Sequence, residues 1–275
     1  MIQEERRKEI IRLLQTNVSL ETNRLAAAFG VSPVTVRRDF EYFEKQGFLT
    51  CTYGGAIVNH SLPEFARADL ESTDLFHEKE LIAKEAVKLV EPNSTIILDS
   101  GSTVKELAIE LLEKRDIVVL TNSILAINVL AQAKNNISLF VFPGQFRLNS
   151  MGFFGSSTVS FLEMVHADYA FLGTTGVSAD SGCTIKDLEE VYAKTMMSKA
   201  AEKTVVLADH TKLGVRSLFT ALPLSDVDML ITGSGNEEEA SRIAQSCKQV
   251  VTVDVNKAHF DISDELNGTR NIHAK

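Results

Sequence analysis

Four clusters of polar residues and glycines in this sequence have the chemistry of an anion-binding site. Each follows an apolar, β-branched run, where a parallel strand would end. A loop rich in serine and glycine that enters a helix offers backbone N–H groups and hydroxyls to an anion, and the helix dipole adds to the attraction. A lysine adds a compact positive charge. The clusters comprise Asp99, Ser100, Gly101, Ser102 and Thr103; Thr121, Asn122 and Ser123; Thr174 and Thr175; and Asp209 and Lys212.

Each cluster also has a structural interpretation that needs no ligand. Thr103 begins a capping-box pattern, Thr-Val-Lys-Glu, in front of an apolar helical series. Asn122 or Ser123 can cap the helix that follows it. Asp209 can accept backbone donors within a turn, and Lys212 can be a solvated lysine. The ligand-binding interpretation therefore depends on the clusters meeting at one edge of a sheet.

A different set of residues near the start of the sequence could read DNA. Ser32 is suited to cap a helix, and Pro33 is suited to its first position, because its missing N–H costs nothing there. Apolar residues at spacings of four and then three form one stripe that we expect to be buried, namely Val36, Phe40 and Phe43. Helices expected at residues 2–14 and 23–29 precede this one, and Gly30 is placed to end the second.

The outward face of the third helix has Thr35, Arg37 and Arg38, with Ser32 at its start. A helix that follows another across a short turn can enter the major groove, where arginine contacts guanine and threonine contacts the thymine methyl group. The alternative is an ordinary solvated arginine face. Asp39 lies near the buried stripe, so we expect it to orient an arginine or to cap a neighbouring helix.

Two short strands are expected after this helix. Residues 47–53 and 56–58 flank Gly54 and Gly55, a pattern typical of a hairpin with a two-residue turn. Such a hairpin forms a wing beside a DNA-reading helix. We therefore expect Tyr53 and Gly54 at the DNA as well.

Composition and charge narrow the class of protein. The 275 residues are 44% hydrophobic and have no low-complexity segment, which excludes disordered and collagen-like chains. Residues 1–60 hold eight basic and seven acidic side chains, a net charge of +1, whereas the rest holds 20 basic and 30 acidic side chains, a net charge of −10. The first sixty residues are thus electrically distinct from the remainder.

Membrane, export and metal-binding signals are weak in the sequence. The charge-free window 117–133 has 17 residues with several polar side chains, too few to span a bilayer. The charged start differs from a signal peptide, so we expect a cytoplasmic protein. The three cysteines, Cys51, Cys183 and Cys247, lie far apart and without metal-ligand spacing. We expect reduced thiols, no metal and no cofactor.

The region after the expected wing alternates short β-branched runs with helical patterns, which predicts an α/β domain with a parallel sheet. Helices are expected at residues 78–90, 104–112, 124–133, 188–201 and 237–247. Strands are expected at residues 95–98, 117–120, 138–142, 169–172, 204–208, 229–232 and 250–253.

The run from residue 31 to 39, followed by residues 54–56, resembles the winged helix-turn-helix signature of the DeoR family of bacterial transcriptional regulators. The resemblance implies that the helix with Arg37 and Arg38 reads the DNA. The sequence departs from the family in the wing, where residues 51–53 are Cys-Thr-Tyr instead of the basic residue and histidine that often precede the two glycines.

The polar clusters extend this resemblance over nearly the whole chain. They are similar to the effector domain of DeoR regulators, whose fold resembles ribose-5-phosphate isomerase, glucosamine-6-phosphate deaminase and CoA transferases. The ligand implied is a phosphorylated sugar or a related metabolite. Two departures affect the part of the pocket that reads the sugar: Pro143-Gly144 replaces the usual paired glycines, and Gly233 stands where aspartate usually follows Thr232. Arg147 is either an anion partner or part of a surface salt bridge.

These observations predict a winged helix-turn-helix domain at residues 1–58, a linker at 59–76 around Pro63, and an effector domain at 77–275. The expected function is regulation of transcription, as a repressor of a carbohydrate operon that a phosphorylated sugar releases from double-stranded operator DNA. A two-fold oligomer, dimer or tetramer, would place two reading helices on two half-sites.

Two alternative functions fit the same sequence less well. The first is a sugar-phosphate isomerase or deaminase, whose general base would be Asp99, Glu189, Glu190 or Asp209. The spacing of these carboxylates singles out none of them as the base. Similarity of fold to an enzyme does not by itself imply the enzyme's activity. The second is a protein-docking winged helix, against which the outward arginines argue.

Overall fold

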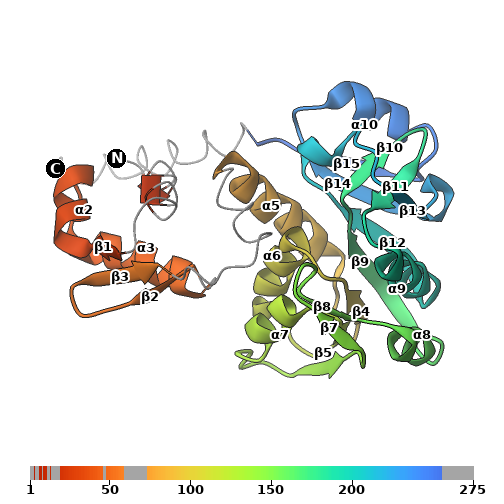
Figure 1. The fold of residues 1–275 in the computed structure, drawn as a ribbon, viewed down its shortest axis with the longest axis horizontal. Helices are drawn as coiled ribbons and strands as arrows, with labels where there is room; N and C mark the ends of the chain where they lie inside the picture. The colour runs from red at the N-terminus through yellow and green to blue at the C-terminus, as the bar shows by residue number, and fades with distance from the viewer. Residues whose placement is uncertain are drawn as a thin grey trace, which may run out of the picture. The chain divides into compact units, whose positions relative to one another are not determined.

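The computed structural model describes residues 19–45, 48–58 and 73–255, together with residues 3, 6, 7, 9, 10 and 13, which are helical. The chain divides into two compact units, residues 1–76 and 77–275 (Figure 1). Most of the linker expected at 59–76 lies outside the described residues. Its end does not, because helix α5 (Thr73–Ala86) begins at Thr73, inside that range.

The N-terminal unit packs helices against a three-stranded antiparallel sheet in the order β1-β3-β2. Its elements are β1 (Ser19–Glu21), α2 (Thr22–Phe29), α3 (Pro33–Lys45), β2 (Leu49–Cys51) and β3 (Gly55–Val58). The expected buried stripe of α3 is confirmed, since Val36, Phe40 and Phe43 are at most 1% exposed. Strand β1 was not expected from the sequence, because three residues are too few for a periodicity to be recognised.

The turn between α2 and α3 forms as the sequence predicts. Gly30 ends α2 in the left-handed conformation at φ 66°, which costs glycine little. The N–H of Val31 donates to the carbonyl O of Ala26 and the N–H of Gly30 to that of Ala27, the pattern of a Schellman motif. Ser32 then caps α3 by accepting from the N–H of Thr35 at 3.2 Å.

The turn of the wing lies one residue earlier than expected. Cys51 pairs with Ala56, and Thr52 and Gly55 exchange backbone hydrogen bonds, so the two turn residues are Tyr53 and Gly54, not Gly54 and Gly55. Gly55 belongs to β3 because β1 approaches it closely. A Cβ at Gly55 would lie 2.0 Å from the carbonyl O of Leu20.

The C-terminal unit is built on a seven-stranded parallel sheet in the order β15-β14-β12-β9-β4-β5-β6. All the strands expected from the sequence are present. They are β4 (Thr95–Leu98), β5 (Ile117–Thr121), β6 (Ile137–Val141), β9 (Ala167–Gly173), β12 (Ala201–Leu207), β14 (Met229–Gly233) and β15 (Val250–Val253).

Helices cover both faces of this sheet (Figure 1). The five expected helices are α5, α6 (Ser102–Glu110), α7 (Ile124–Leu130), α9 (Leu188–Lys199) and α10 (Glu237–Ile243). The first three pack on one face, where Ile96 and Leu98 of β4 point, and the other two pack on the opposite face with Ile97. Short 3-10 turns at Val87–Leu89, Leu111–Glu113, His210–Lys212 and Leu224–Asp226 complete the helical elements.

Two small antiparallel sheets and one helix were not expected from the sequence. The hairpin of β7 (Gln145–Arg147) and β8 (Gly152–Phe154) leads into helix α8 (Ser156–Leu162), which packs beside α9. Strands β10 (Gly176–Ser178), β11 (Gly182–Ile185) and β13 (Phe219–Leu222) form the second small sheet. Both sheets follow carboxyl ends of the main strands, where they border the polar clusters.

Candidate functional site

The DNA-reading face predicted on α3 is exposed. Arg37, Arg38 and Ser32 are exposed and Thr35 is half-buried, and among the described residues neither arginine has an ion-pair partner. The hydroxyls of Ser32 and Thr35 lie 2.9 Å apart, so the helix cap also fixes the orientation of Thr35. Two guanidinium groups are therefore available to phosphates or base edges.

Asp39 anchors the reading helix to the first helix, although not through the arginines of its own helix. It is buried, and its carboxylate accepts from Arg6 Nε at 2.5 Å and from Arg7 Nε at 3.2 Å. The guanidinium of Arg7 also lies 3.5 Å above the ring centre of Tyr42. The expectation that Asp39 orients an arginine is thus confirmed, with partners 33 and 32 residues away in the sequence.

The tip of the wing presents an aromatic side chain to solvent. Tyr53 has a relative exposure of 106%, as expected for a side chain at the outermost point of a turn. Gly54 is exposed beside it, and its carbonyl O accepts from the N–H of Thr22 at 3.0 Å, which ties the wing to the start of α2.

The strand order brings the four polar clusters together. Strands β12, β9, β4 and β5 are consecutive neighbours in the sheet and all run parallel. Their carboxyl ends therefore meet at one edge, and each is followed by one of the clusters predicted from the sequence. This adjacency satisfies the condition on which the ligand-binding interpretation depends.

The loop after β4 leads directly into α6 without a side-chain cap. Gly101 has φ 139°, a conformation that side chains rarely adopt, and occupies the N-cap position of α6. Thr103 lies inside the helix, so the capping box expected as its structural role does not form. The Nζ of Lys79 donates to Ser102 Oγ at 2.9 Å. Ser100 is buried just ahead of the helix.

Asp99 is among the most deeply buried members of the site, together with Thr121 and Asn122. It is fully buried, and its Oδ2 accepts from the N–H of Gly173 at 3.1 Å and from Lys194 Nζ of α9. Its Oδ1 is buried without a hydrogen-bond partner. Burial alone would lower the pKa of Lys194, but the charges of Asp99 and Glu190 and the hydrogen bond to Asp99 raise it above its ordinary value.

The loop after β5 combines two structural residues with one unpaired amide. Thr121 donates to the carbonyl O of Leu98 at 2.7 Å and accepts from the N–H of Ser123. Ser123 caps α7 by accepting from the N–H of Ala126. Asn122 is fully buried, and neither Oδ1 nor Nδ2 has a partner. A buried amide without partners is costly, which marks Asn122 as a position where a ligand could supply them.

The hairpin β7-β8 covers this part of the edge. The N–H of Phe153 donates to the carbonyl O of Asn122 at 2.8 Å, and a Cβ at Gly152 would lie 3.1 Å from Ser100 Cβ. Arg147 of β7 forms ion pairs with Asp187, at 3.5 Å, and with Glu189, which agrees with the salt-bridge alternative considered for it. Its Nε remains buried without a partner.

Gly144 precedes the same hairpin and is exposed. A Cβ there would lie 2.7 Å from both the carbonyl O of Phe154 and Thr158 Oγ1. The glycine is thus required by close packing of the backbone around the base of the hairpin.

The loops after β9 and β12 are held mainly by internal hydrogen bonds. Thr174 Oγ1 donates to the carbonyl O atoms of Gly176 and Thr184, and Thr175 bonds to Thr184 through its backbone N–H. Asp209 is buried and accepts from Thr211, as the turn interpretation expected. Lys212 is half-buried, and its ammonium has no partner among the described residues.

Comparison with known protein families identifies both units. The DeoR-like helix-turn-helix domain matches residues 6–62, and the DeoR C terminal sensor domain matches residues 76–234. The chain belongs to the DeoR family. The resemblance recognised in residues 31–39 and in the polar clusters is therefore confirmed, as is the expected fold class: this DeoR-family protein joins a winged helix-turn-helix to an α/β sensor domain built on a parallel sheet.

Relatives of this DeoR-family protein are named as repressors. A putative aga operon transcriptional repressor of Escherichia coli O157:H7 is 32% identical, over 84% of this chain and 86% of its own. The HTH-type transcriptional repressor GlcR of Bacillus subtilis (strain 168) is 32% identical, over 84% and 89%. A glycerol-3-phosphate regulon repressor of Escherichia coli (strain K12) is 28% identical, over 84% and 91%.

Solved structures with a similar chain path include two classes of protein. Ribose 5-phosphate isomerase A from Methanocaldococcus jannaschii is 23% identical with a TM-score of 0.37, covering 51% of this chain and 55% of that chain. The eIF2B beta subunit from Chaetomium thermophilum is 13% identical with a TM-score of 0.43, covering 66% and 56%.

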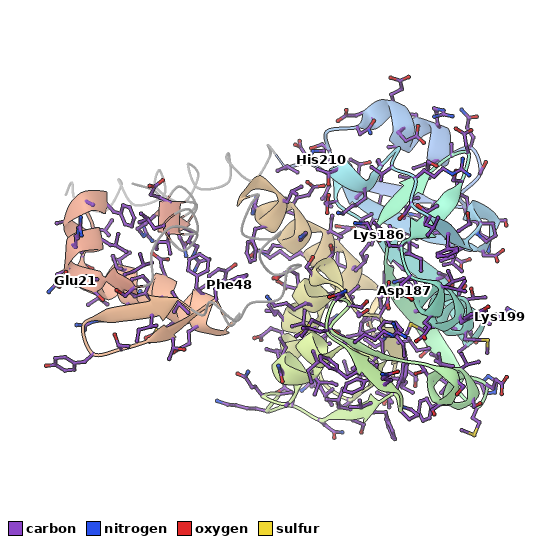
Figure 2. All side chains as sticks on the ribbon, viewed as in Figure 1. Glu21, Phe48, Lys186, Asp187, Lys199 and His210 are labelled. Carbon is purple, nitrogen blue, oxygen red and sulfur yellow. The ribbon has the colours of Figure 1, made fainter. Side chains whose placement is uncertain are left out.

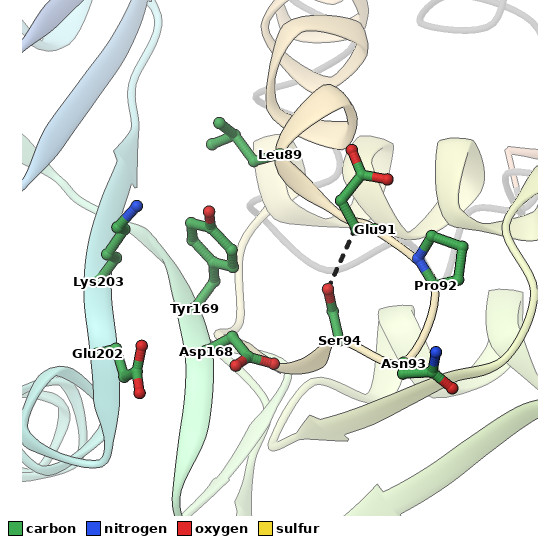
Figure 3. Close-up of a pocket in the computed structure, with 9 residues that line it drawn as sticks. All are labelled: Leu89, Glu91, Pro92, Asn93, Ser94, Asp168, Tyr169, Glu202 and Lys203. Carbon is green, nitrogen blue, oxygen red and sulfur yellow. Dashed lines mark hydrogen bonds between the residues drawn. The ribbon is translucent and has the colours of Figure 1, made fainter.

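A cavity of about 330 Å³ lies at the opposite edge of the sensor sheet (Figure 3). It is lined at the amino ends of β4, β9 and β12 by residues that include Ser94, Asp168, Tyr169 and Lys203. None of the predicted site residues lies there. We therefore assign the candidate site of this DeoR-family protein to the carboxyl edge, on the chemistry of its residues.

Several residues of the carboxyl edge were not predicted from the sequence. Lys194 and Lys79 contact Asp99 and Ser102 respectively, but each lies in a helix whose pattern is ordinary for a surface helix.

No helix in the described part of the DeoR-family chain is long and apolar enough to cross a membrane. The described residues also contain no metal-binding group of histidine, cysteine and carboxylate side chains. All three cysteines are free.

Proposed function

We propose that this DeoR-family protein represses a carbohydrate operon and leaves its operator DNA when a phosphorylated sugar binds the carboxyl edge of the sensor sheet. The DNA contacts would come from Ser32, Thr35, Arg37 and Arg38, with Tyr53 and Gly54 at the wing. Such binding takes place on chromosomal DNA and hence in the cytoplasm. Relatives named as an operon repressor, a transcriptional repressor and a regulon repressor support this assignment.

The free guanidinium groups of Arg37 and Arg38 support the DNA-binding half of the proposal. Both are exposed on a helix that Asp39 fixes from its buried side through Arg6 and Arg7. A rigid helix with unpaired arginines can combine phosphate contacts with contacts to guanine. Because phosphate contacts release counterions, we expect binding to weaken steeply with salt.

The effector half depends most on one observation: two polar groups are buried without partners beside a helix start that has no side-chain cap. These groups are Asp99 Oδ1 and the amide of Asn122, and the helix is α6. A phosphate would accept from backbone N–H groups of α6 and from Lys212, while sugar hydroxyls would satisfy Asp99 and Asn122. Ser100, Gly101, Ser102, Thr103, Thr121, Ser123, Gly144, Arg147, Thr174, Thr175 and Asp209 would shape the surrounding wall.

A two-fold oligomer would match two half-sites of an operator. Strand β6 supports association of the sensor domains, since it lies at the edge of the sheet with Phe140 and Val141 exposed by 52% and 43%. An exposed apolar edge strand is usually covered by a partner. Light scattering of the purified protein would measure the number of protomers.

We propose binding without turnover as the role of the site. Each carboxylate considered as a general base already has a partner: Asp99 has Lys194, Asp209 has Thr211, Glu189 has Arg147 and Glu190 has Ser150. Incubation with ribose 5-phosphate and glucosamine 6-phosphate would test this point, because robust conversion of either would favour the isomerase or deaminase alternative.

The main test is a thermal-shift screen of phosphorylated sugars, run beside gel retardation of the DNA upstream of the protein's own gene cluster. A ligand at about a hundred times its Kd adds about 2.7 kcal/mol of stability. We expect one sugar phosphate both to raise the melting temperature and to release the DNA, while the unphosphorylated sugar does neither. Failure of the protein to retain any of this DNA would contradict the proposal.

A further inference from the structure

Two consecutive side chains of α5 hold the loops after β12 and β4. The carboxylate of Glu78 accepts from the backbone N–H of His210 at 2.5 Å and lies 2.6 Å from His210 Nδ1. The next residue, Lys79, donates to Ser102 Oγ at the start of α6. Figure 2 shows His210 near the first turns of α5. Helix α5 therefore contacts both loops that the proposed function assigns to phosphate binding.

The contact between Glu78 and His210 is built by the surrounding sequence. Glu78 is 1% exposed, so its carboxylate has been taken out of water to make this contact. A Cβ at Gly233 would lie 2.1 Å from Glu78 Oε1, and a Cβ at Gly235 would lie 2.9 Å from His210 Cδ2. Only glycines at the end of β14 leave room for both partners. The departure at Gly233 noted in the sequence thus has a physical role.

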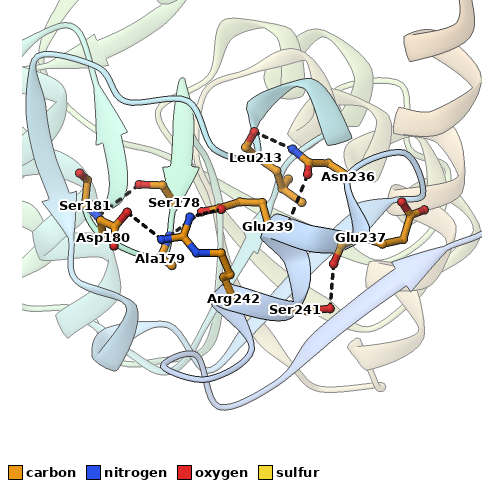
Figure 4. Close-up of polar contacts among 10 residues, drawn as sticks. All are labelled: Ser178, Ala179, Asp180, Ser181, Leu213, Asn236, Glu237, Glu239, Ser241 and Arg242. Atoms are coloured by element: carbon orange, nitrogen blue, oxygen red, sulfur yellow. Dashed lines mark hydrogen bonds and ion pairs between the residues drawn. The ribbon is translucent and has the colours of Figure 1, made fainter.

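The loop that contains His210 is also fixed on its other side. The Nδ2 of Asn236, which caps α10, donates to the carbonyl O of Leu213 at 3.1 Å (Figure 4). The N–H of Gly214 donates to the carbonyl O of Val177 at 2.8 Å. Because the loop is held at Leu213 and Gly214, we expect a displacement of Lys212 to shift His210 and its contact with α5.

Helix α5 is the first described element after residue 58, and the boundary between the two units falls within it, after Phe76. We propose that the pair Glu78 and His210 couples the effector loop 209–214 to α5, and thereby transmits the binding of a phosphorylated sugar toward the DNA-binding unit. This inference rests on the proposed function and adds its route of regulation. The pair positions the loop against α5 and does not itself contact the ligand.

The coupling is tested in the full chain with Glu78→Ala, which removes both hydrogen bonds, and with His210→Ala, which removes the one at Nδ1 and keeps the backbone N–H. Glu78→Gln is the conservative variant, since its amide can still accept from the backbone N–H and donate to Nδ1. Glu85→Ala is the matched control, because Glu85 lies on the same helix and, among the described residues, pairs only with exposed Lys88. Thermal melts establish that each variant folds.

The measurements are the Kd for ribose 5-phosphate and glucosamine 6-phosphate, and the concentration of each that releases half of the bound DNA. For both alanine variants we expect the Kd to change little and the releasing concentration to rise on the order of tenfold, the usual size of an allosteric coupling. Glu78→Gln and Glu85→Ala should behave as wild type. The coupling would be overturned if the ratio of the releasing concentration to the Kd were the same in wild type and in both alanine variants.

Failure of both sugar phosphates to bind the wild type would count against the proposed function. In that case, hydrogen exchange of the ligand-free protein still tests the contact between α5 and the loop. We expect Glu78→Ala to speed exchange in residues 210–214, and His210→Ala to speed exchange in α5, with no effect of Glu85→Ala. Unchanged exchange across the contact in both alanine variants would refute the coupling, even if a ligand of the site were found later.

Discussion

Lys194 of α9 joins the ends of two adjacent strands through Asp99. Its Nζ contacts Asp99 Oδ2, which follows β4, and lies 3.0 Å from the carbonyl O of Gly173 at the end of β9. The two residues are 4% and 0% exposed. The pair therefore fixes Asp99 so that Oδ1 alone remains for a ligand.

Replacing Lys194 by methionine should destabilise the sensor domain strongly. The substitution keeps the length of the side chain but leaves the carboxylate of Asp99 buried without its cation, a change that costs about 3–5 kcal/mol. Urea unfolding followed by circular dichroism measures the loss. The double variant Lys194→Met/Asp99→Asn should recover much of it, because the buried charge is then removed as well. Equal stability of the single and double variants would contradict this account of the pair.

Removal of the Asp39 carboxylate should weaken DNA binding without touching the DNA-reading face. Asp39→Ala leaves buried Arg6 without this anionic partner and frees Arg7 from the reading helix. We expect the N-terminal unit to lose about 3–5 kcal/mol of stability and DNA retention to fall with it. Glu41→Ala, on the exposed side of the same helix, is the control and should change neither. Retention at the wild-type level by Asp39→Ala would contradict the anchoring role.

The sequence predicted those features that local pattern determines. The stripe of α3, the glycine that ends α2 and all seven main strands follow from periodicity and capping within a few residues of chain. The meeting of four polar loops also follows from the sequence, since parallel strands end at one edge. The structure adds that the four strands β12, β9, β4 and β5 are direct neighbours in the sheet, which the sequence did not predict.

The features that were missed depend on contacts between distant parts of the chain. Lys194 lies 95 residues from Asp99, and Glu78 lies 132 residues from His210, so no local pattern marks either pair. The position of the wing turn was missed for the same reason. Gly54-Gly55 looks like the turn until β1, far from it in sequence, takes Gly55 into the sheet.

Arg37→Ala and Arg38→Ala should each abolish the specific retention of promoter DNA while leaving both units folded. Their guanidinium groups are exposed and have no ion-pair partner in the described part of the chain, so their loss should cost little stability. It should remove contacts of about 1–3 kcal/mol each at base edges, or a phosphate contact. Gel retardation with specific and scrambled duplexes separates these two roles. Arg115→Ala removes an exposed arginine of the sensor unit and should bind as wild type. Wild-type retention by both α3 variants would refute the assignment of the reading helix.

Substitution by alanine should destabilise the N-terminal unit at Gly55 but have little effect at Gly54. A Cβ at Gly55 would lie 2.0 Å from the carbonyl O of Leu20, whereas one at Gly54 would meet nothing within 4 Å. Gly55→Ala must therefore separate β1 from β3, and we expect a loss on the order of 1–3 kcal/mol in the N-terminal unit. Gly54→Ala should stay within about 0.5 kcal/mol of wild type. Thermal melts of both variants test the placement of the turn, and equal effects would show that Gly55 lies in the turn after all.

The stability difference between Glu78→Gln and wild type should grow with pH in favour of the glutamine variant. Burial raises the pKa of Glu78 above 4.5 and outweighs the hydrogen bonds and charge of His210, which lower it. The folded state therefore holds this proton more tightly than the unfolded state. The contribution of Glu78 to stability is fully present below pH 4.5 and is lost as the pH rises through the raised pKa.

Melting temperatures of both proteins measured from about pH 4 to about pH 7 test this sign, because the contributions of groups that do not interact with residue 78 cancel in the difference. Glutamine resembles the protonated carboxyl group at every pH, so it escapes the cost of burying the charge. Glu85→Gln removes a half-buried carboxylate of the same helix, paired with exposed Lys88, and should show no comparable trend. A difference that is constant over this range, or that shrinks as the pH rises, would mean that His210 stabilises the Glu78 carboxylate by at least as much as its burial costs.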